Sequence, residues 1–267
     1  MGSFEFILKI ITQYYPLLLR GIAITMLLSI SGTIVGFIIG LLVGVVRTIP
    51  QPESKNALWW LLKFINMLIS MYVQLFRCTP MMVQAMVIYF GIAKATGYEV
   101  DRLFAGFIII SINTGAYMAE IVRGGIDSID AGQFDAARAI GMTHWQTMLH
   151  VIIPQTVRNI LPATGNEFVI NIKDSSVLMV ITVTELFYYG KVIIANSYRA
   201  FETYLVIAAI YFILTYSITR LLRFVERRLD GPQSYDILNS GTTAEAVATA
   251  AARAAAKGTR RVKSRAK

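Results

Sequence analysis

The stretch from Ile22 to Val46 runs for 25 residues without a charged side chain. An α-helix rises about 1.5 Å per residue, so a helix of this length extends beyond the roughly 30 Å hydrocarbon core of a bilayer. Apolar strands inside soluble enzymes are far shorter. The run therefore predicts a membrane-spanning helix and argues against a soluble enzyme.

The composition of the 267-residue chain extends this prediction. Hydrophobic residues make up 55% of it and charged residues 15%, whereas a soluble domain is about 25% charged. Long apolar segments separated by polar ones predict an all-α integral membrane protein with about five transmembrane helices, in one domain over residues 1–238. The expected spans are about 17–46, 58–93, 103–122, 159–186 and 203–222.

Two of these spans carry further features. The second is expected to break near 76–80, because Arg77 and Pro80 do not suit one straight helix. We expect 58–76 to be partly interfacial and 79–93 to be the deeper span. The first span has glycines at every fourth position, a small-residue pattern that lets helices approach closely. These are Gly32, Gly36, Gly40 and Gly44.

The net charge of +9 is unevenly distributed. Residues 241–267 hold seven Lys or Arg residues and one acid, Glu245, and so contribute +6. This basic, alanine-rich tail (239–267) lacks bulky periodic residues, so we expect it to be disordered or to lie on a lipid surface, without a nucleic-acid partner. Cys78 is the single cysteine, so there is no intrachain disulfide.

Basic residues also predict the orientation. With five crossings and the N-terminus outside, eighteen Lys and Arg residues face the cytoplasm and six face the outside, while Lys173 lies within a span. Cytoplasmic loops of membrane proteins are enriched in Lys and Arg. The C-terminus is therefore expected in the cytoplasm.

This orientation places the long polar segment 123–158 in the cytoplasm. Asp130 can cap a helix with Gln133 three residues later, and Gly141 suits the position that ends it. Thr143 can cap a second helix with Gln146. We expect helices at about 131–140 and 144–152, with Pro154 stopping the second.

Apolar side chains follow the helical period in both short helices. They either pad the cytoplasmic ends of the spans or dock a soluble partner, because amphipathic helices are common groove-filling ligands. Ile129 and Phe134 form a candidate hydrophobic staple. The expected faces are Phe134, Ala137 and Ile140 in the first helix, and Trp145, Met148, Leu149 and Ile152 in the second.

The segment "DAARAIG", followed by "IIP", resembles the EAA loop of permease subunits of ATP-binding-cassette importers. Three further stretches, "QLFRCTP" (74–80), "GAYMAEIVRGGIDSI" (115–129) and "LPATGNEFVINIKDSSV" (161–177), resemble the polar amino-acid uptake branch. The similarity covers about residues 10–235. The chain departs from the family where Asp135 replaces Glu and Cys78 replaces Gly. The loop positions matched are Asp135, Ala136, Ala137, Gly141 and Pro154.

The resemblance implies a transporter subunit of the bacterial inner membrane, not an enzyme. In this family the EAA loop docks on a separate ATPase subunit, which binds ATP and Mg. The sequence agrees, because it contains no phosphate-binding G-x-x-x-x-G-K-[S/T] motif and implies no cofactor in this chain. The resemblance also implies a second permease subunit, identical or related, and an extracytoplasmic binding protein that delivers the substrate.

The fourth span contains charged residues, which normally line a pathway or form pairs inside a membrane. Glu167, Asn171 and Asp174 are spaced to share one helical face with Leu178, and they are the first candidates for substrate binding. The alternative is structural, with Lys173 paired to a carboxylate such as Glu120. Gln84, Asn113 and Tyr117 are further candidates for a cavity wall, or for helix–helix hydrogen bonds.

Two acidic residues on this helix favour a basic amino acid such as arginine, lysine or histidine, as in related importers of basic amino acids. Glutamine, glutamate or cystine import is the alternative within the family. Outside it, an ion-coupled carrier or a membrane-embedded sensor subunit stays open. His144 and His150 lie in the loop without a metal or catalytic constellation, so no metal site or catalytic residue is expected.

Overall fold

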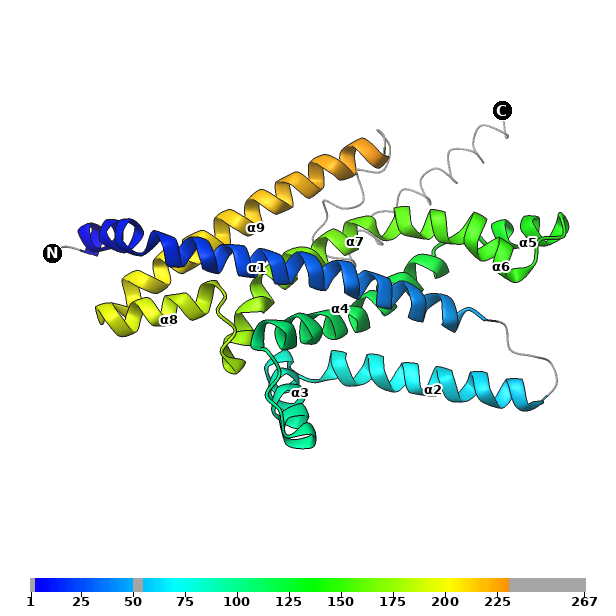
Figure 1. Ribbon diagram of the computed structural model, residues 1–267. Coiled ribbons are helices and arrows are strands. Elements are labelled where there is room, and N and C mark those ends of the chain that lie inside the picture. The colour runs from blue at the N-terminus through cyan, green and yellow to red at the C-terminus, as the bar shows by residue number, and fades with distance from the viewer. Residues whose placement is uncertain (1–2, 50–54, 231–267) are drawn as a thin grey trace, which may run out of the picture. The chain divides into compact units, whose positions relative to one another are not determined.

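The computed structural model describes residues 3–49 and 55–230. Every regular element within these ranges is a helix, which confirms the all-α prediction (Figure 1). Residues up to Arg220 form one compact unit, and residues from Leu221 belong to a second. The basic tail 239–267 lies outside the described residues. The helices are α1 (Ser3–Arg47), α2 (Ala57–Cys78), α3 (Met81–Thr96), α4 (Arg102–Asp127), α5 (Ala131–Ala139), α6 (His144–Thr147), α7 (Ile153–Asp174), α8 (Leu186–Ser197) and α9 (Ala200–Asp230).

Helix α1 is longer than the predicted span at 17–46. It has 45 residues and includes Pro16 in its interior. Ile10 and Leu18, on the two sides of this proline, are buried against residues of α8 and α9, among them Ile193 and Val206. This packing explains why the helix starts earlier than its hydropathy indicated.

The four glycines of the repeat in α1 (Gly32, Gly36, Gly40 and Gly44) face α4, along which α1 runs in Figure 1. A Cβ atom added to Gly36 would lie 2.7 Å from Cβ of Thr114. One added to Gly40 would lie 2.6 Å from the backbone carbonyl carbon of Met118. Since no side chain fits there, the glycine repeat sets how closely the two helices pack.

The break in the second predicted span lies at Thr79 and Pro80, between α2 and α3. Pro80 begins α3 from an extended conformation, which suits a residue without a backbone N–H. The lengths of these two helices differ from the prediction that the first is partly interfacial and the second is the deeper span. Helix α2, with 22 residues, is long and apolar enough to cross a membrane, whereas the 16 residues of α3 are too few. At about 1.5 Å per residue, α3 falls short of the hydrocarbon core.

The fourth predicted span, 159–186, is not one helix. Helix α7 ends at Asp174, a 3₁₀-helical segment η2 (Ser175–Ile181) follows, and α8 continues at an angle of 54°. The buried Glu185 caps α8 by accepting hydrogen bonds from the backbone N–H groups of Phe187 (2.8 Å) and Tyr188 (2.7 Å). Tyr211 on α9 donates a third bond of 2.7 Å to the same carboxylate. These three bonds hold the bend in place.

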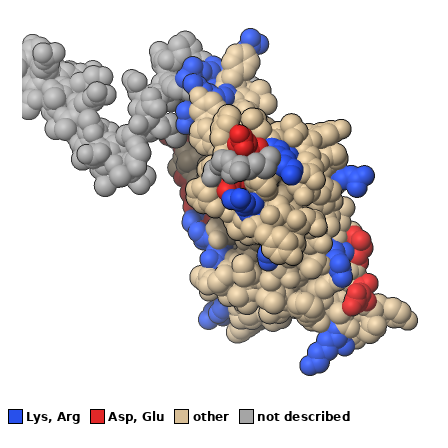
Figure 2. All heavy atoms as spheres, turned by 90° about the vertical axis from the view of Figure 1, so that its left-hand side faces the viewer, with Lys and Arg blue, Asp and Glu red and all other residues tan. Residues whose placement is uncertain are grey.

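Within the described ranges, four helices are long and apolar enough to cross a membrane, and the bent pair makes a fifth candidate. Figure 2 shows charged side chains scattered over a surface made mostly of other residues. Large apolar side chains stay exposed along the outer sides of the helices, as lipid contact requires. Examples are Leu19, Leu27, Ile34, Leu42 and Phe212.

Candidate functional site

Asp130 caps the first short helix of the loop, α5, as predicted, but Gln133 does not take part in the cap. The Asp130 carboxylate accepts a hydrogen bond of 2.7 Å from the backbone N–H of Gly132. Gln133 does not complete a capping box, because its side chain accepts a bond of 3.3 Å from Gln155 instead. Gly141, just after the helix, has a positive φ of 80°, the left-handed conformation predicted for it.

The second short helix starts with a complete capping box, as predicted. Gln146 accepts a bond of 2.8 Å from the Thr143 backbone N–H, and Thr143 Oγ1 accepts one of 3.3 Å in return. The prediction that Pro154 stops this helix is wrong. Helix α6 continues through a π-helical segment η1 (Met148–Ile152) into α7, where Pro154 lies in the first turn. A π-turn just before a proline accommodates its ring and its missing N–H.

The loop has an inner and an outer side. Ala137, Met148 and Ile152 are buried, and the latter two pack with Val122 and Ile126 of α4. The apolar residues of the outer side have no such contacts, so the predicted face of the second helix is divided between the two sides. The exposed fractions are 78% for Ile140, 50% for Trp145 and 57% for Leu149.

The residues that matched the EAA pattern are also divided between buried and exposed positions. Ala137 is buried, whereas Asp135, Ala136, Gly141 and Pro154 are exposed. Figure 1 shows α5 and α6 together at the start of α7. The alanine is thus packed inside the protein, and the other four are open to a partner.

Glu167 and Asp174 lie two turns apart on α7, separated by about 10 Å of helix rise. Both are half-buried, and neither forms a hydrogen bond or an ion pair with any residue that the structure describes. Carboxylates inside a membrane protein are costly without a partner, so they mark a candidate ligand site.

Asn171 lies between these carboxylates in sequence but faces the protein interior. It is buried, its Oδ1 accepts a bond of 3.0 Å from Thr114 on α4, and its Nδ2 donates one of 2.9 Å to Thr33 on α1. Leu178 is also buried, in the 3₁₀-helical segment. The polar stripe predicted from a single regular helix is therefore interrupted, and the Asn171 amide joins three helices.

Gln84 and Asn113 form a second structural pair. The Gln84 amide donates bonds of 2.9 Å and 2.8 Å to the carbonyl oxygens of Phe76 and Thr79 at the end of α2. Asn113 donates a bond of 2.8 Å to Gln84 Oε1. The pair fixes the break between α2 and α3, which favours the helix–helix alternative for both residues.

Tyr117 lies beside Arg77, which was not among the predicted site residues. The guanidinium carbon is 5.7 Å from the centre of the Tyr117 ring and the Nη1 atom is 3.8 Å from Glu120 Oε2. An arginine inside an apolar segment was the signal in the sequence that Arg77 has polar contacts of this kind.

Glu120 pairs with arginines rather than with Lys173. Its Oε1 atom is 2.9 Å from Arg47, and its Oε2 atom is 3.0 Å from Arg123. No ion pair of Lys173 occurs among the described residues, so the structural alternative proposed for it is not found there. The exposed Lys173 lies at a hollow instead.

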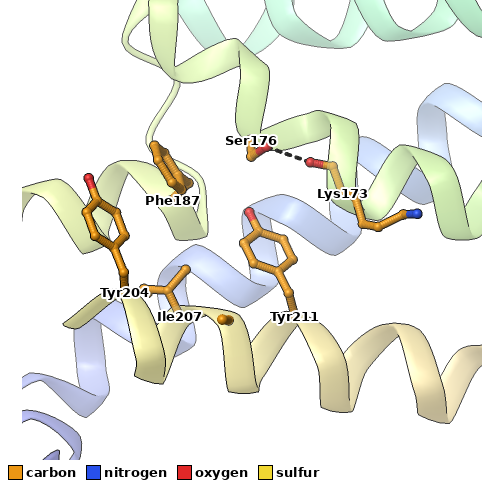
Figure 3. A pocket seen from close by; sticks show the side chains of 7 residues that line it. Lys173, Ser176, Phe187, Tyr204, Ile207 and Tyr211 are labelled. Carbon is orange, nitrogen blue, oxygen red and sulfur yellow. Dashed lines mark hydrogen bonds between the residues drawn. The ribbon is translucent and has the colours of Figure 1, made fainter. Parts of the chain in front are cut away.

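This hollow lies between the end of α7, α8 and α9 and has a volume of about 410 Å³. Figure 3 shows Phe187 and Tyr211 approaching it from different helices, while Ser176 donates a hydrogen bond of 2.6 Å to the carbonyl oxygen of Lys173. Apart from Lys173 and the hydroxyl groups its walls are apolar. The lining residues are Lys173, Ser176, Phe187, Tyr204, Ile207, Ala208 and Tyr211.

Comparison with known proteins identifies the family. Residues 57–231 match the family model of binding-protein-dependent transport system inner membrane components. The chain belongs to this family. These permeases are membrane subunits of ATP-binding-cassette importers, in which separate ATPase subunits hydrolyse ATP. This membership argues against the two hypotheses outside the family, an ion-coupled carrier and a membrane-embedded sensor subunit.

Relatives of this permease transport amino acids and related compounds, as their names state. The glutamine transport system permease protein of Escherichia coli (strain K12) is 38% identical over 215 residues, which cover 80% of this chain and 93% of that protein. The arginine transport system permease protein of Bacillus subtilis (strain 168) is 32% identical, with 80% and 93% covered. The nopaline transport system permease protein of Agrobacterium fabrum is 33% identical, with 82% and 90% covered.

Solved structures agree with this assignment. An amino acid ABC transporter described as "with histidines" matches the permease with a TM-score of 0.70 and 37% identity, covering 82% of this chain and 96% of that one. A methionine ABC transporter shares the fold, with a TM-score of 0.68 and 21% identity, over 82% of this chain and 99% of that one. The protein is thus a multi-pass inner-membrane permease subunit of an amino-acid importer, with ATPase and binding-protein partners.

Proposed function

We propose that this permease imports a polar L-amino acid, with a cationic side chain preferred. The observation that carries the proposal is the pair of half-buried carboxylates, Glu167 and Asp174, which have no hydrogen-bonding or ion-pairing partner in the described part of the chain. An ammonium or guanidinium group of a substrate would supply the missing positive charge. Tyr117, a further candidate for the cavity wall, lies beside Arg77 of α2.

Glutamine is the second candidate. It is favoured by the 38% identity to the glutamine permease of Escherichia coli, which exceeds the 32% identity to the arginine permease of Bacillus subtilis. A glutamine side chain is neutral but can donate hydrogen bonds to a carboxylate through its amide. A cationic side chain needs a second carboxylate as its counter-charge, whereas a neutral glutamine side chain needs it less.

Uptake by the reconstituted permease, with its ATPase and binding protein, distinguishes these candidates. L-arginine, L-lysine, L-histidine and L-glutamine would compete for uptake of a labelled substrate. Glu167→Gln and Asp174→Asn are expected to lower the uptake of basic amino acids at least tenfold, the factor that about 1.4 kcal/mol corresponds to. Unchanged uptake in both variants would assign the carboxylates a structural role.

The outer side of the loop is the proposed ATPase contact. Ile140, Trp145 and Leu149 are exposed apolar side chains at the end of α5, in α6 and in η1. The inner side of this loop packs on α4 and α7. A groove on the ATPase would cover them, and movement of the loop would pass through Met148 and Ile152 to the spans. ATP and Mg would be bound by that partner.

A second permease subunit completes the proposed assembly. Two-fold symmetry would present one loop to each of two ATPase subunits, whether the second permease is identical or related. The extracytoplasmic binding protein would approach the opposite side. The proposed orientation has the N-terminus outside and the loop in the cytoplasm.

A further inference from the structure

The first turns of α1, residues 3–15, lie before Pro16 and are called here the N-terminal segment. The whole helix has 45 residues and therefore rises about 67 Å, more than twice the roughly 30 Å of a hydrocarbon core. The uncharged run 22–46 is long enough to fill that core by itself. Figure 1 shows the N-terminal segment, in dark blue, at the end of the molecule away from α5 and α6. The segment thus lies beyond the core, on the membrane side opposite the loop.

One face of the N-terminal segment packs on α8 and α9. Ile10 is buried in a cluster with Ile193 of α8 and Val206 of α9. The guanidinium carbon of Arg199, just before α9, lies 5.2 Å from the centre of the Phe6 ring, a distance typical of a cation–π contact. These contacts fix how the segment is rotated about its axis. The residues of this protein face are Phe6, Ile7, Ile10 and Tyr14.

A second face of the segment is apolar but exposed. Its four large side chains follow one another at intervals of four, three and four residues, so they share one side of the helix. Their exposed fractions lie between 44% and 72%. Side chains of this size need a cover other than water. The residues of this apolar face are Phe4, Leu8, Ile11 and Tyr15.

A third face is polar and separates the apolar face from the protein face. Glu5, Lys9 and Gln13 follow at intervals of four residues, and all three are exposed. A helix that lies in the plane of a membrane interface has one polar face toward water and one apolar face toward the acyl chains. The N-terminal segment has both, in addition to the face that holds it to the protein.

The apolar face continues into the lipid-facing side of the span. Leu19, one turn after Tyr15, is 58% exposed and begins the row of exposed apolar side chains along α1. Tyr15 and the exposed Arg20 are residue types that gather at the membrane boundary. Pro16, between them, removes a backbone hydrogen bond and permits a bend, and the dark-blue turns before it are tilted against the rest of α1 in Figure 1.

We propose that the N-terminal segment is an interfacial helix whose partner is the lipid surface on the side of the membrane opposite the loop. Its apolar face enters the boundary between headgroups and acyl chains, its polar face meets water, and its protein face holds α8 and α9. The segment therefore anchors the corner between α8 and α9 to the bilayer surface, and the first span begins only after Pro16. This inference goes beyond the proposed function and does not depend on the substrate.

Spin labels on three consecutive residues test the three faces. Leu8→Cys, Lys9→Cys and Ile10→Cys are each made in a Cys78→Ser background, which leaves one cysteine to label. The complex of permease and ATPase is placed in lipid nanodiscs, and collisions of the label with oxygen and with a water-soluble nickel chelate are measured. Oxygen concentrates among acyl chains, whereas the nickel chelate stays in water, so the ratio of the two collision rates reports depth.

The label at Leu8→Cys is expected to lie about 5–10 Å into the boundary of the acyl chains, with oxygen collisions dominant. Nickel collisions should dominate at Lys9→Cys, and both should be low at Ile10→Cys. Leu27→Cys, at an exposed position on the span of the same helix, is the control and should be deeper than Leu8→Cys.

Three results would overturn the inference. Dominant nickel collisions at Leu8→Cys would place the apolar face in water. Protection of Leu8→Cys from both probes would mean that a second permease subunit covers this face. A depth equal to that of Leu27→Cys would make the segment part of the span. If Ile10→Cys does not assemble, the other two positions still decide, because both are on the surface.

Discussion

The Asn171 amide donates a hydrogen bond of 2.9 Å to the Thr33 hydroxyl group and so joins α7 to α1. Thr33 donates in turn to the carbonyl oxygen of Ser29, and Thr114 of α4 donates to Asn171 from the other side. All these side chains are buried. Three helices that are far apart in the sequence therefore meet at one buried polar junction.

This relationship predicts a stability effect for Asn171→Ala. The substitution removes two buried hydrogen bonds, and bonds between membrane helices contribute about 0.6 kcal/mol on average and up to about 1.7. The midpoint of thermal unfolding of the purified complex should fall, while the affinity for the amino acid should change less than twofold. A large loss of affinity at unchanged thermal stability would instead return Asn171 to the substrate site.

Much of the architecture was predictable because it depends on local sequence. The uncharged run of α1, its glycine repeat, and the Thr143 capping box each act over a few residues, and the structure places them as expected. The π-turn before Pro154 was not expected, because a proline usually ends a helix. A wider π-turn can accommodate the hydrogen bond that a proline cannot donate, so the helix continues. The sequence alone does not show whether a helix ends at a proline or continues in this way.

The candidate site was harder to predict, because it depends on which helical face is turned inward. The residues 167–178 were treated as one regular helix, whereas the change to a 3₁₀-helical segment at Ser175 alters the positions that follow. The direction of Asn171 depends on Thr33 and Thr114, which are distant in sequence. Arg77 likewise lies beside Tyr117 of another helix, a contact between residues that are distant in sequence.

The glycine repeat predicts that Gly40→Val disrupts the contact between α1 and α4. The added Cβ would lie 2.6 Å from the Met118 backbone, which cannot move aside without separating the helices. Gly91→Val is the control, because a Cβ at Gly91 of α3 meets no atom within 4 Å. The amount of folded permease in membranes should fall sharply only for Gly40→Val. Equal yields of the two variants would argue against close packing at the repeat.

The two sides of the loop predict two different defects. Trp145→Asp and Leu149→Asp alter exposed side chains, so they should reduce association with the ATPase without lowering the thermal stability of the permease. Met148→Ala removes a fully buried side chain and should cost about 2–5 kcal/mol of stability. Co-purification of the ATPase and thermal unfolding measure the two effects. Full ATPase association in both aspartate variants would place the docking surface elsewhere.

The loop orientation is testable with cysteine labelling in a Cys78→Ser background. Ala139 and Tyr198 are exposed near opposite ends of the spans, so a cysteine at each reports one side of the membrane. In intact cells, a membrane-impermeant maleimide should label Tyr198→Cys and spare Ala139→Cys, as the excess of basic residues on the loop side predicts. The reverse pattern would require the inverted orientation.

Two glycines near the loop predict stability changes of opposite sign. Gly141 has a φ of 80°, which costs other residues about 1–2 kcal/mol, so Gly141→Ala should lower stability by that amount. Gly124 lies in α4, where a Cβ meets no atom within 4 Å, so Gly124→Ala should raise stability by about 0.5–1 kcal/mol. Thermal unfolding of the two variants checks both signs. A rise in stability for Gly141→Ala would mean that the turn at Gly141 does not need a left-handed residue.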